Sequence, residues 1–402
     1  MARPEELMED LAKESVALHA EVHGKLETKS KVALKTRKDL SLAYTPGVAQ
    51  VCLEIAKNPA RVFDLTIKHN TVAVVSDGSA ILGIGNLGAA AALPVMEGKA
   101  VLFKEFANVD AFPLCLDTQD VGGIVQVVRA IAPAFGGINL EDISAPRCFE
   151  IEAQLQNLDI PVFHDDQHGT AIVVLAALLN ALKVTNQRLD DCTIVFSGSG
   201  ASAIACARLI LHAGATGLCP TVGDIILCDS KGIVHANRSD LNPAKRDMAT
   251  RTNRRRLSGN LADALKGAHV FIGLSQPNLV TTEMVRTMNA NPIIFAMANP
   301  VPEIMPDAAR AGGAVVVGTG RSDHPNQINN VLAFPGVFRG ALDASARVIN
   351  DDMKTAAAQA LANYVIEPTP ERILPDPLDR QIAHRVGAAV AAAARRTGVC
   401  RN

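Results

Sequence analysis

The middle of the chain alternates two patterns of apolar residues. Short runs rich in Val, Ile and Phe are separated by Ala-rich stretches whose apolar residues repeat at helical spacing. We expect strands at residues 193–197, 224–228, 269–274, 293–297 and 314–318. We expect helices between them at residues 201–213, 258–266, 281–288 and 306–311. This alternation predicts an α/β fold with a doubly wound parallel sheet of the Rossmann type.

The N-terminal part follows a different pattern and predicts a separate α/β domain. A strand at residues 72–76 runs into a turn at Asp77-Gly78-Ser79 and a second strand at 80–84, which together suggest a hairpin. The remaining expected elements are a strand at 112–117, a helix at 122–132 and a linking helix at 167–184. We therefore divide the chain into an α/β domain at 1–163, a Rossmann domain at 164–340 and a helical segment at 341–402. The last segment is expected to pack back on the first domain.

Composition and charge narrow the class of protein. The 402 residues suffice for two cores, and 48% hydrophobic with 20% charged residues is typical of a globular chain. A formal net charge of -2 gives no basic field for nucleic acid or an anionic membrane. The longest uncharged apolar run, 169–182, is shorter than the roughly 20 residues that span a bilayer. The eight cysteines form no CxxC pair, so we expect reduced thiols in a cytoplasmic protein. Charge and hydropathy together lead us to expect small-molecule ligands, without nucleic-acid or membrane partners.

Two glycine-rich segments, 83–88 and 198–203, match the loose dinucleotide fingerprint. The second follows a buried strand and opens an apolar helix, so its backbone N–H groups can hold a pyrophosphate. Its members are Gly198, Ser199, Gly200, Ala201, Ser202 and Ala203. Asp229 ends the next strand, 26 residues after Ala203, and would bond the adenosine ribose of NAD or NADP. The basic Lys231 and Arg238 leave the choice between the two open, and the first segment is interpreted as tight turns near the substrate.

Two pairs of adjacent acids, Glu141-Asp142 and Asp165-Asp166, are candidates for a metal site. A hard divalent cation such as Mg²⁺ or Mn²⁺ prefers carboxylate and water oxygens. The alternative is that these acids simply cap helices, which is common for Asp before a helix. His164 and His168 are four residues apart, but no third soft ligand lies nearby, which argues against zinc.

Several segments, in their order along the chain, resemble those of the malic enzyme family. The resemblance is to the compact bacterial and archaeal form, which lacks a C-terminal acyltransferase-like domain. They are residues 41–49 (SLAYTPGVA), 77–83 (DGSAILG), 94–99 (PVMEGK), 140–142 (LED), 163–171 (FHDDQHGTA), 298–300 (ANP) and 326–331 (NQINNV). The resemblance extends from about Gly24 to about Asp343. It implies a homodimer that oxidises and decarboxylates L-malate to pyruvate and CO₂, reduces NAD⁺ or NADP⁺, and depends on Mg²⁺ or Mn²⁺. Residues 1–163 would then be the malate- and metal-binding catalytic domain.

The same resemblance implies catalytic roles. Lys99 would be the base that takes the proton from the C2 hydroxyl of malate, with Asp165 orienting its ammonium group and Lys104 as a nearby substitute. Tyr44 would be the acid that protonates C3 of enolpyruvate after CO₂ leaves, and in the compact form it can come from the partner chain. The residues that would hold the metal are Glu141, Asp142 and Asp166.

The substrate carboxylates would be bound by Asn299, Asn329 and Asn330, with Asn299 also beside the dinucleotide. Larger malic enzymes carry an Arg at the position of Ala80, so another group must meet the distal carboxylate here. Arg321 is the first candidate and Arg147 the second, although either side chain could instead form a structural ion pair.

Two other functions compete with this interpretation. One is a redox-neutral or non-oxidative decarboxylase on the same scaffold, which would convert malate to lactate or oxaloacetate to pyruvate. The other is a catalytically inactive dinucleotide-sensing module, which predicts the loss of a key Lys, Tyr or metal carboxylate. All of these residue types are present in the matching segments.

Overall fold

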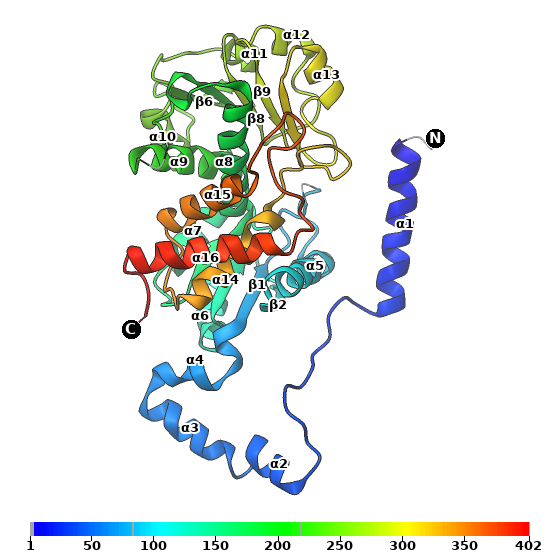
Figure 1. Cartoon of the computed structure of the whole chain (residues 1–402), viewed down its shortest axis with the longest axis vertical. Coiled ribbons are helices and arrows are strands. Elements are labelled where there is room, and N and C mark those ends of the chain that lie inside the picture. Colours follow the sequence, from blue (N-terminus) through cyan, green and yellow to red (C-terminus); the bar gives the residue numbers. More distant parts are fainter. Residues whose placement is uncertain (1–3, 83, 218, 402) are drawn as a thin grey trace.

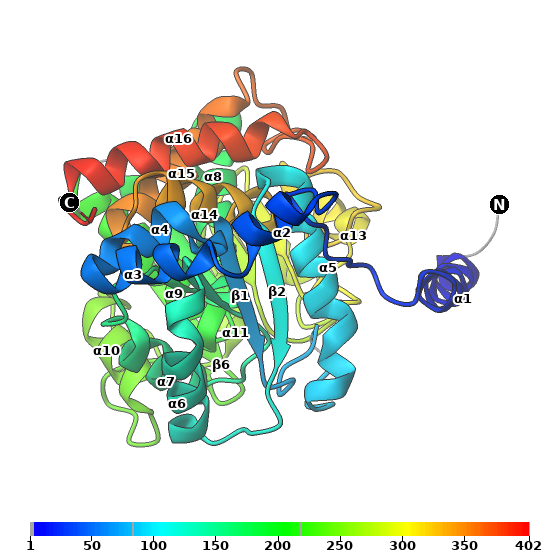
Figure 2. The ribbon, with the colours of Figure 1, turned by 90° about the horizontal axis from the view of Figure 1, so that it is seen from below.

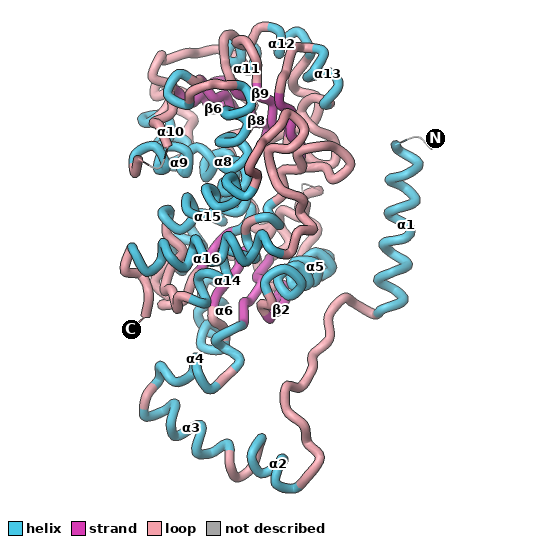
Figure 3. The backbone as a smooth tube through the Cα atoms, in the orientation of Figure 1, coloured by secondary structure: helices cyan, strands magenta, loops and turns pink. Residues whose placement is uncertain are grey.

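The computed structural model describes residues 4–82, 84–217 and 219–401. Two separate sheets, parallel except for one strand pair, form its frame, with a layer of helices between them (Figures 1 and 3). The first sheet has the order β2-β1-β3-β4, with β1 at Thr71–Ser76, β2 at Asp110–Cys115, β3 at Gly137–Leu140 and β4 at Val162–His164. The helices that follow its first three strands are α5 (Ala89–Ala107), α6 (Val121–Ile131) and α7 (Arg147–Leu155).

The second sheet has the order β10-β9-β8-β5-β6-β7, and only the last pair is antiparallel. Its strands are β5 (Thr193–Ser197), β6 (Asp224–Asp229), β7 (Gly232–Ile233), β8 (Val270–Gly273), β9 (Ile293–Ala296) and β10 (Val316–Thr319). Its helices are α9 (Ala201–Ala215), α10 (Pro243–Arg251), α11 (Leu261–Leu265), α12 (Thr282–Arg286) and α13 (Pro306–Ala311). The predicted doubly wound α/β fold is therefore confirmed, and β5 and α13 have the expected bounds.

The expected helix at 258–266 is shorter than predicted, and the cause is local. The Asn260 side chain accepts a hydrogen bond from the Asp263 N–H, and the Asp263 carboxylate accepts one from the Asn260 N–H. This capping box satisfies the free donors at a helix start, so α11 begins at Leu261.

The hairpin expected at residues 72–84 is wrong. β1 pairs in parallel with β2 and β3, and the described residues among 80–84 form no strand beyond an isolated bridge between Ile81 and Gly85. The segment turns back instead, because the Gly78 carbonyl accepts hydrogen bonds from the N–H groups of Leu87 and Gly88. Gly78 has a φ of +66°, and a Cβ there would lie 2.2 Å from the Gly88 carbonyl oxygen, so the turn requires glycine. Gly83 lies outside the described residues.

Helix α8 (Asp165–Thr185) joins the two sheets. By length and composition it could cross a membrane, but 72% of its apolar stretch is buried in the protein. It packs against α9 and against α15 (Asp351–Tyr364), so its apolar surface belongs to the shared core. Of the other C-terminal helices, α14 (Phe334–Asp343) and α16 (Gln381–Arg396) contact each other and also α5 of the first sheet.

The N-terminal arm is the least embedded part of the chain. Helix α1 (Pro4–Val22) stands apart from the body in both views, and a long connection leads to α2 (Arg37–Ala43), α3 (Val48–Lys57) and α4 (Val62–Leu65) (Figures 1 and 2). None of the residues of α2, α3 and α4 is buried. Short 3₁₀ turns lie at Pro59–Arg61, Ile67–Asn70, Ala132–Ala134, Leu189–Asp191 and Asn330–Leu332.

Candidate active site

The two pairs of acids meet because two neighbouring strands end at the same edge of the first sheet. β3 and β4 are parallel, with Leu140 opposite His164. Glu141-Asp142 follow β3 directly, and Asp165-Asp166 follow β4 as the first turn of α8. Parallel strands present their carboxyl ends together, so this placement brings the four acids close to one another.

Three of these acids form a candidate metal centre. One carboxylate oxygen from each of Glu141, Asp142 and Asp166 lies within 4.8 Å of the other two. Asp142 adopts a φ of +54°, and its N–H donates to Asp166 Oδ2 at 2.9 Å. Its buried Oδ2 has no hydrogen-bond partner among the described residues. An unpartnered buried carboxylate oxygen within a cluster of anions fits the oxygen ligand set of Mg²⁺ or Mn²⁺.

The electrostatics of the cluster agree with this fit. Burial, together with repulsion from Asp166 and Glu141, raises the pKa of Asp142 to about 8. Burial raises the pKa of Glu141 to about 7, although the Lys99 ammonium opposes that shift. The protein alone therefore resists placing full negative charge here, and a divalent cation would reverse that effect by favouring the ionised carboxylates.

Lys99 lies beside the acidic cluster, on α5. Its side chain is 8% exposed, and its Nζ lies 2.6 Å from Asp165 Oδ2 and 3.0 Å from Glu141 Oε1. The ring of Phe334 is 4.2 Å from the same nitrogen. Burial alone would lower the pKa of Lys99, but the carboxylates of Asp165 and Glu141 outweigh it and raise that pKa above its ordinary value. Lys99 is thus shared between Asp165 and an acid of the candidate metal centre.

The glycine loop between β5 and α9 has the form that a dinucleotide requires. Gly198 has a φ of +107°, and a Cβ there would lie 2.6 Å from the Leu274 carbonyl oxygen. The Ser199 hydroxyl is buried and has no hydrogen-bond partner in the described part of the chain, and α9 begins at Ala201 with no side-chain cap, so donors remain available for a phosphate. Ser202 Oγ donates to the Asp166 carbonyl at 2.7 Å, which joins this loop to the acidic cluster.

Asp229 ends β6 as predicted, but its carboxylate is already paired. Arg238 donates to both of its oxygens, at 2.8 and 3.1 Å, and Lys245 Nζ lies 2.7 Å from Oδ2. Lys231 pairs instead with Asp240 at 3.0 Å. A ribose hydroxyl that binds Asp229 would therefore also lie near the Arg238 and Lys245 side chains.

Two family models match most of the chain. Residues 167–395 match the family model described as "Malic enzyme, NAD binding domain", and residues 23–122 match "Malic enzyme, N-terminal domain". The chain belongs to the malic enzyme family. The predicted resemblance is thereby confirmed.

Individual malic enzymes align with nearly the whole chain. The NAD-dependent malic enzyme of Geobacillus stearothermophilus is 56% identical over 383 residues, which cover 94% of this chain and 78% of that protein. The bifunctional malic/malolactic enzyme of Bacillus subtilis is 54% identical, with coverage of 97% and 95%. The crystal structure of the NAD-dependent malic enzyme of Thermotoga maritima matches with a TM-score of 0.89 at 47% identity, covering 94% of this chain and 98% of that one.

The predicted substrate residues of this malic enzyme lie in different settings. Asn330 Nδ2 donates to Asp165 Oδ2, so it adjoins Lys99. The Asn329 side chain caps the following 3₁₀ turn by accepting from the Val331 N–H at 2.9 Å. Asn299 follows β9, and its amide nitrogen lies 3.0 Å from where a Cβ on Gly320 would be, so the two loops approach closely there.

The two arginine candidates for the distal carboxylate already have partners. Arg321 forms two hydrogen bonds with Asp323, at 2.8 and 2.7 Å, and a third with the Pro300 carbonyl. Arg147 lies 3.0 Å from Asp77 Oδ2 and donates to Ser144 Oγ and to the Gln119 carbonyl. Each would have to leave an anion to bind substrate.

Two predicted catalytic candidates lie outside the site within one chain. Tyr44 is 68% exposed at the end of α2, and its hydroxyl has no hydrogen-bond partner among the described residues. Lys104 is exposed on α5 and donates to Asp110 and Asn108, so it does not replace Lys99 as the buried lysine.

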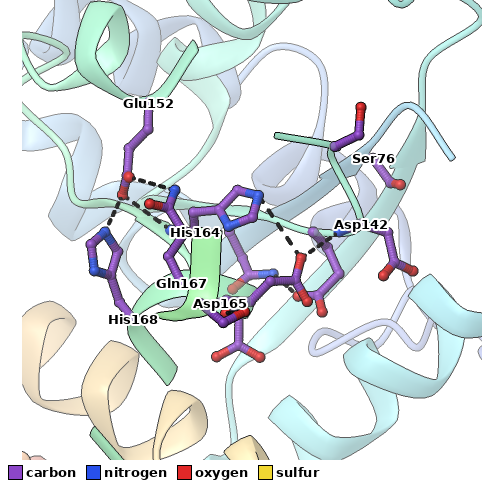
Figure 4. Close-up of polar contacts among 12 residues, drawn as sticks. Ser76, Asp142, Glu152, His164, Asp165, Gln167 and His168 are labelled. Carbon is purple, nitrogen blue, oxygen red and sulfur yellow. Dashed lines mark hydrogen bonds and ion pairs between the residues drawn. The ribbon is translucent and has the colours of Figure 1, made fainter. Parts of the chain in front are cut away.

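Our sequence reasoning missed Glu152. The buried residues of α7 are Cys148, Ile151, Glu152 and Leu155, whose spacing is that of one helix face. A carboxylate on an apolar helix face needs buried partners, and that pattern was the available signal. In the structure, Glu152 accepts hydrogen bonds from the segment that carries Asp165 and Asp166 (Figure 4).

Proposed function

We propose that this malic enzyme converts L-malate to pyruvate and CO₂ with reduction of NAD⁺ or NADP⁺, and that it requires Mg²⁺ or Mn²⁺. The observation that carries the proposal is the position of Lys99. Its ammonium group lies between Asp165 and Glu141, and Glu141 also belongs to the candidate metal centre. A base and a cation site that share one carboxylate can act on the same substrate hydroxyl.

Lys99 would accept the proton of the C2 hydroxyl once it has lost its own proton. Asp165 and Glu141 hold that proton on Lys99, so weakening the contact with Glu141 would free the base. Glu141, Asp142 and Asp166 would hold the divalent cation, which would supply positive charge beside Glu141 and beside the substrate oxygen on which charge develops. Residues 198–203 would hold the dinucleotide, which would supply the hydride acceptor for C2. Asp165, itself held by Asn330, would keep Lys99 aimed at the substrate.

Tyr44 would protonate C3 of the enolpyruvate, and we propose that it does so in a homodimer. Its exposure beside α2 and α3, neither of which has a buried residue, supports a position completed by a second copy of the chain. Leu40 and Leu42, in the helix before it, are also largely exposed and would be covered by the same contact. Each active site would then combine Lys99 of one chain with Tyr44 of the partner subunit.

We assign the remaining predicted residues to binding. Asn299, Asn329 and Asn330 would bind the substrate carboxylates, and Asn299 would also adjoin the nicotinamide. Arg321 would reach the distal carboxylate after leaving Asp323. Asp229, with Arg238 and Lys245, would surround the adenosine ribose.

We also propose three units, at residues 1–163, 164–340 and 341–402. The positions of the two sheets and the contact of α16 with α5 support three such units, whose proposed bounds fall within β4 and α14. A cytoplasmic location, with small molecules as the only ligands, is proposed on the basis of composition.

A redox-neutral conversion of malate to lactate is the second candidate, because the Bacillus subtilis relative is named a bifunctional malic/malolactic enzyme. One experiment separates the two. Purified protein is given L-malate and Mn²⁺ with NAD⁺ or NADP⁺, and NAD(P)H, pyruvate and lactate are measured together. NAD(P)H formed in equal amount to pyruvate supports the oxidative function, whereas lactate without NAD(P)H supports the second candidate. Absence of both products contradicts the proposal.

A further inference from the structure

Glu152 is a buried acid that the proposed chemistry does not use. It lies on α7, on the face that packs Cys148, Ile151 and Leu155 into the core. The acids of the candidate metal centre are Glu141, Asp142 and Asp166, so Glu152 is not part of that group. A carboxylate in this position needs a reason, because burying a charge is costly unless the charge is paired and hydrogen-bonded.

Among the described residues, the side-chain hydrogen bonds of Glu152 all lead to one short segment. Its Oε1 accepts from His168 Nε2 at 2.8 Å and from the His164 N–H at 3.3 Å. Its Oε2 accepts from Gln167 Nε2 at 3.1 Å. These partners flank Asp165 and Asp166 on both sides, and Figure 4 shows the three bonds converging on one carboxylate.

The segment needs an external support because it is a junction between a strand and a helix. β4 ends at His164 and α8 begins at Asp165, yet the His164 side chain makes no capping hydrogen bond. A carboxylate near the first turn of a helix is favoured by the helix dipole. Burial alone would raise the pKa of Glu152, but His168 and Lys354 oppose burial and hold it at about 2, so the acceptor is ionised.

We propose that Glu152 is a positioning residue for the metal site. By holding both sides of the Asp165-Asp166 pair, it directs Asp166 toward Glu141 and Asp142 while Asp165 faces Lys99. Ligands held by hydrogen bonds from behind bind a metal more tightly, because less ordering remains for the metal to impose. This inference rests on the proposed function, in which Asp166 is a metal ligand.

The test is Mn²⁺ binding to the metal-free, full-length protein, measured by electron paramagnetic resonance of free Mn²⁺. Glu152→Gln keeps the size of the side chain but turns one acceptor into a donor that faces other donors. Glu150→Gln is the matched control, since Glu150 is an exposed residue of the same helix. We expect Glu152→Gln to weaken Mn²⁺ binding by roughly 10- to 100-fold. Dinucleotide affinity and the control should remain unchanged, and turnover should recover in part at high Mn²⁺.

A purely structural role for Glu152 predicts a different result. The variant would then unfold more easily but bind Mn²⁺ with wild-type affinity in its folded state, and this outcome would overturn the inference. If Glu152→Gln does not fold, Gln167→Met removes one of the three bonds without removing the charge. It should weaken Mn²⁺ binding in the same direction, and unchanged affinity there would also overturn the inference.

Asp166→Asn distinguishes failure of this inference from failure of the proposed function. If Asp166→Asn loses Mn²⁺ affinity while Glu152→Gln and Gln167→Met keep it, only the positioning role is wrong. If Asp166→Asn keeps wild-type affinity, the metal assignment itself is wrong.

Discussion

Replacing Lys99 by Met tests the centre of the proposed mechanism. Met has nearly the length of Lys but carries no charge and no proton, so Asp165 Oδ2 and Glu141 Oε1 lose the nitrogen that lies 2.6 and 3.0 Å away. Loss of a general base lowers turnover by about 10²- to 10⁴-fold. Oxaloacetate is already a ketone and needs no proton removal at C2, so its decarboxylation should fall much less than malate oxidation.

The same substitution has a cost in stability that depends on pH. Breaking a buried ion pair from one side destabilises a protein by about 3–5 kcal/mol, because the remaining charge is unpaired. Glu141 already has a pKa raised to about 7 by burial, and without Lys99 it rises further. The folded variant can therefore protonate this acid below neutral pH, so the destabilisation should shrink from about pH 8 to about pH 6.

The activities to measure are malate oxidation and oxaloacetate decarboxylation. Stability is measured separately, by urea unfolding of the metal-free protein in EDTA at both pH values. Lys104→Met is the control, since this exposed lysine of the same helix pairs with Asp110 outside the site. Wild-type malate oxidation by Lys99→Met, in a folded protein that still binds dinucleotide, would refute the assignment of Lys99 as the base.

Three further predictions follow from the same geometry. Because the pKa of Asp142 is about 8 and that of Glu141 about 7 in the metal-free protein, Mn²⁺ must displace protons at neutral pH, so its affinity should rise toward about pH 8. The slope should not exceed about tenfold per pH unit for each proton released, and calorimetry that finds no proton release would contradict the ligand assignment. Mixing subunits of the inactive Tyr44→Phe and Lys99→Met variants should restore about a quarter of wild-type activity. Half of the re-formed dimers would then carry one complete site out of two. No recovery after confirmed subunit exchange would exclude a shared site. Lys245→Ala should weaken NADP⁺ binding more than NAD⁺ binding, since Lys245 lies 2.7 Å from Asp229, where a 2′-phosphate would sit. Equal losses of affinity for the two cofactors would show that Lys245 does not face that phosphate.

The parts of this structure that follow from local patterns were predictable from the sequence. The glycine loop at 198–203 lies between a strand and a helix that both have clear periodicity. The turn at Asp77-Gly78-Ser79 was also visible, but the partner of β1 was not, because strands β2 and β3 come from more than thirty residues further along the chain. Pairing between distant strands is decided by the whole core and not by the turn.

The candidate site also has a part that the sequence predicts and a part that it does not. The acids Glu141, Asp142, Asp165 and Asp166 could be selected by type, whereas their meeting depends on β3 lying beside β4. The helix periodicity of α7 could have marked Glu152 as buried, but not which segment it holds. Tyr44 shows the limit most clearly, since the proposed completion of its site by a second chain leaves no trace in the pattern of one chain.

The hydrogen bond from Ser202 Oγ to the Asp166 carbonyl bears on any attempt to redesign this enzyme. The glycine loop looks like an exchangeable unit that could be replaced by the loop of another dehydrogenase to change cofactor use. Here Ser202 anchors the backbone of Asp166, a proposed metal ligand, so we expect a transplanted loop without a hydroxyl at that position to disturb cation binding as well. Engineering of the dinucleotide loop must therefore keep Ser202 or supply another donor to the Asp166 carbonyl.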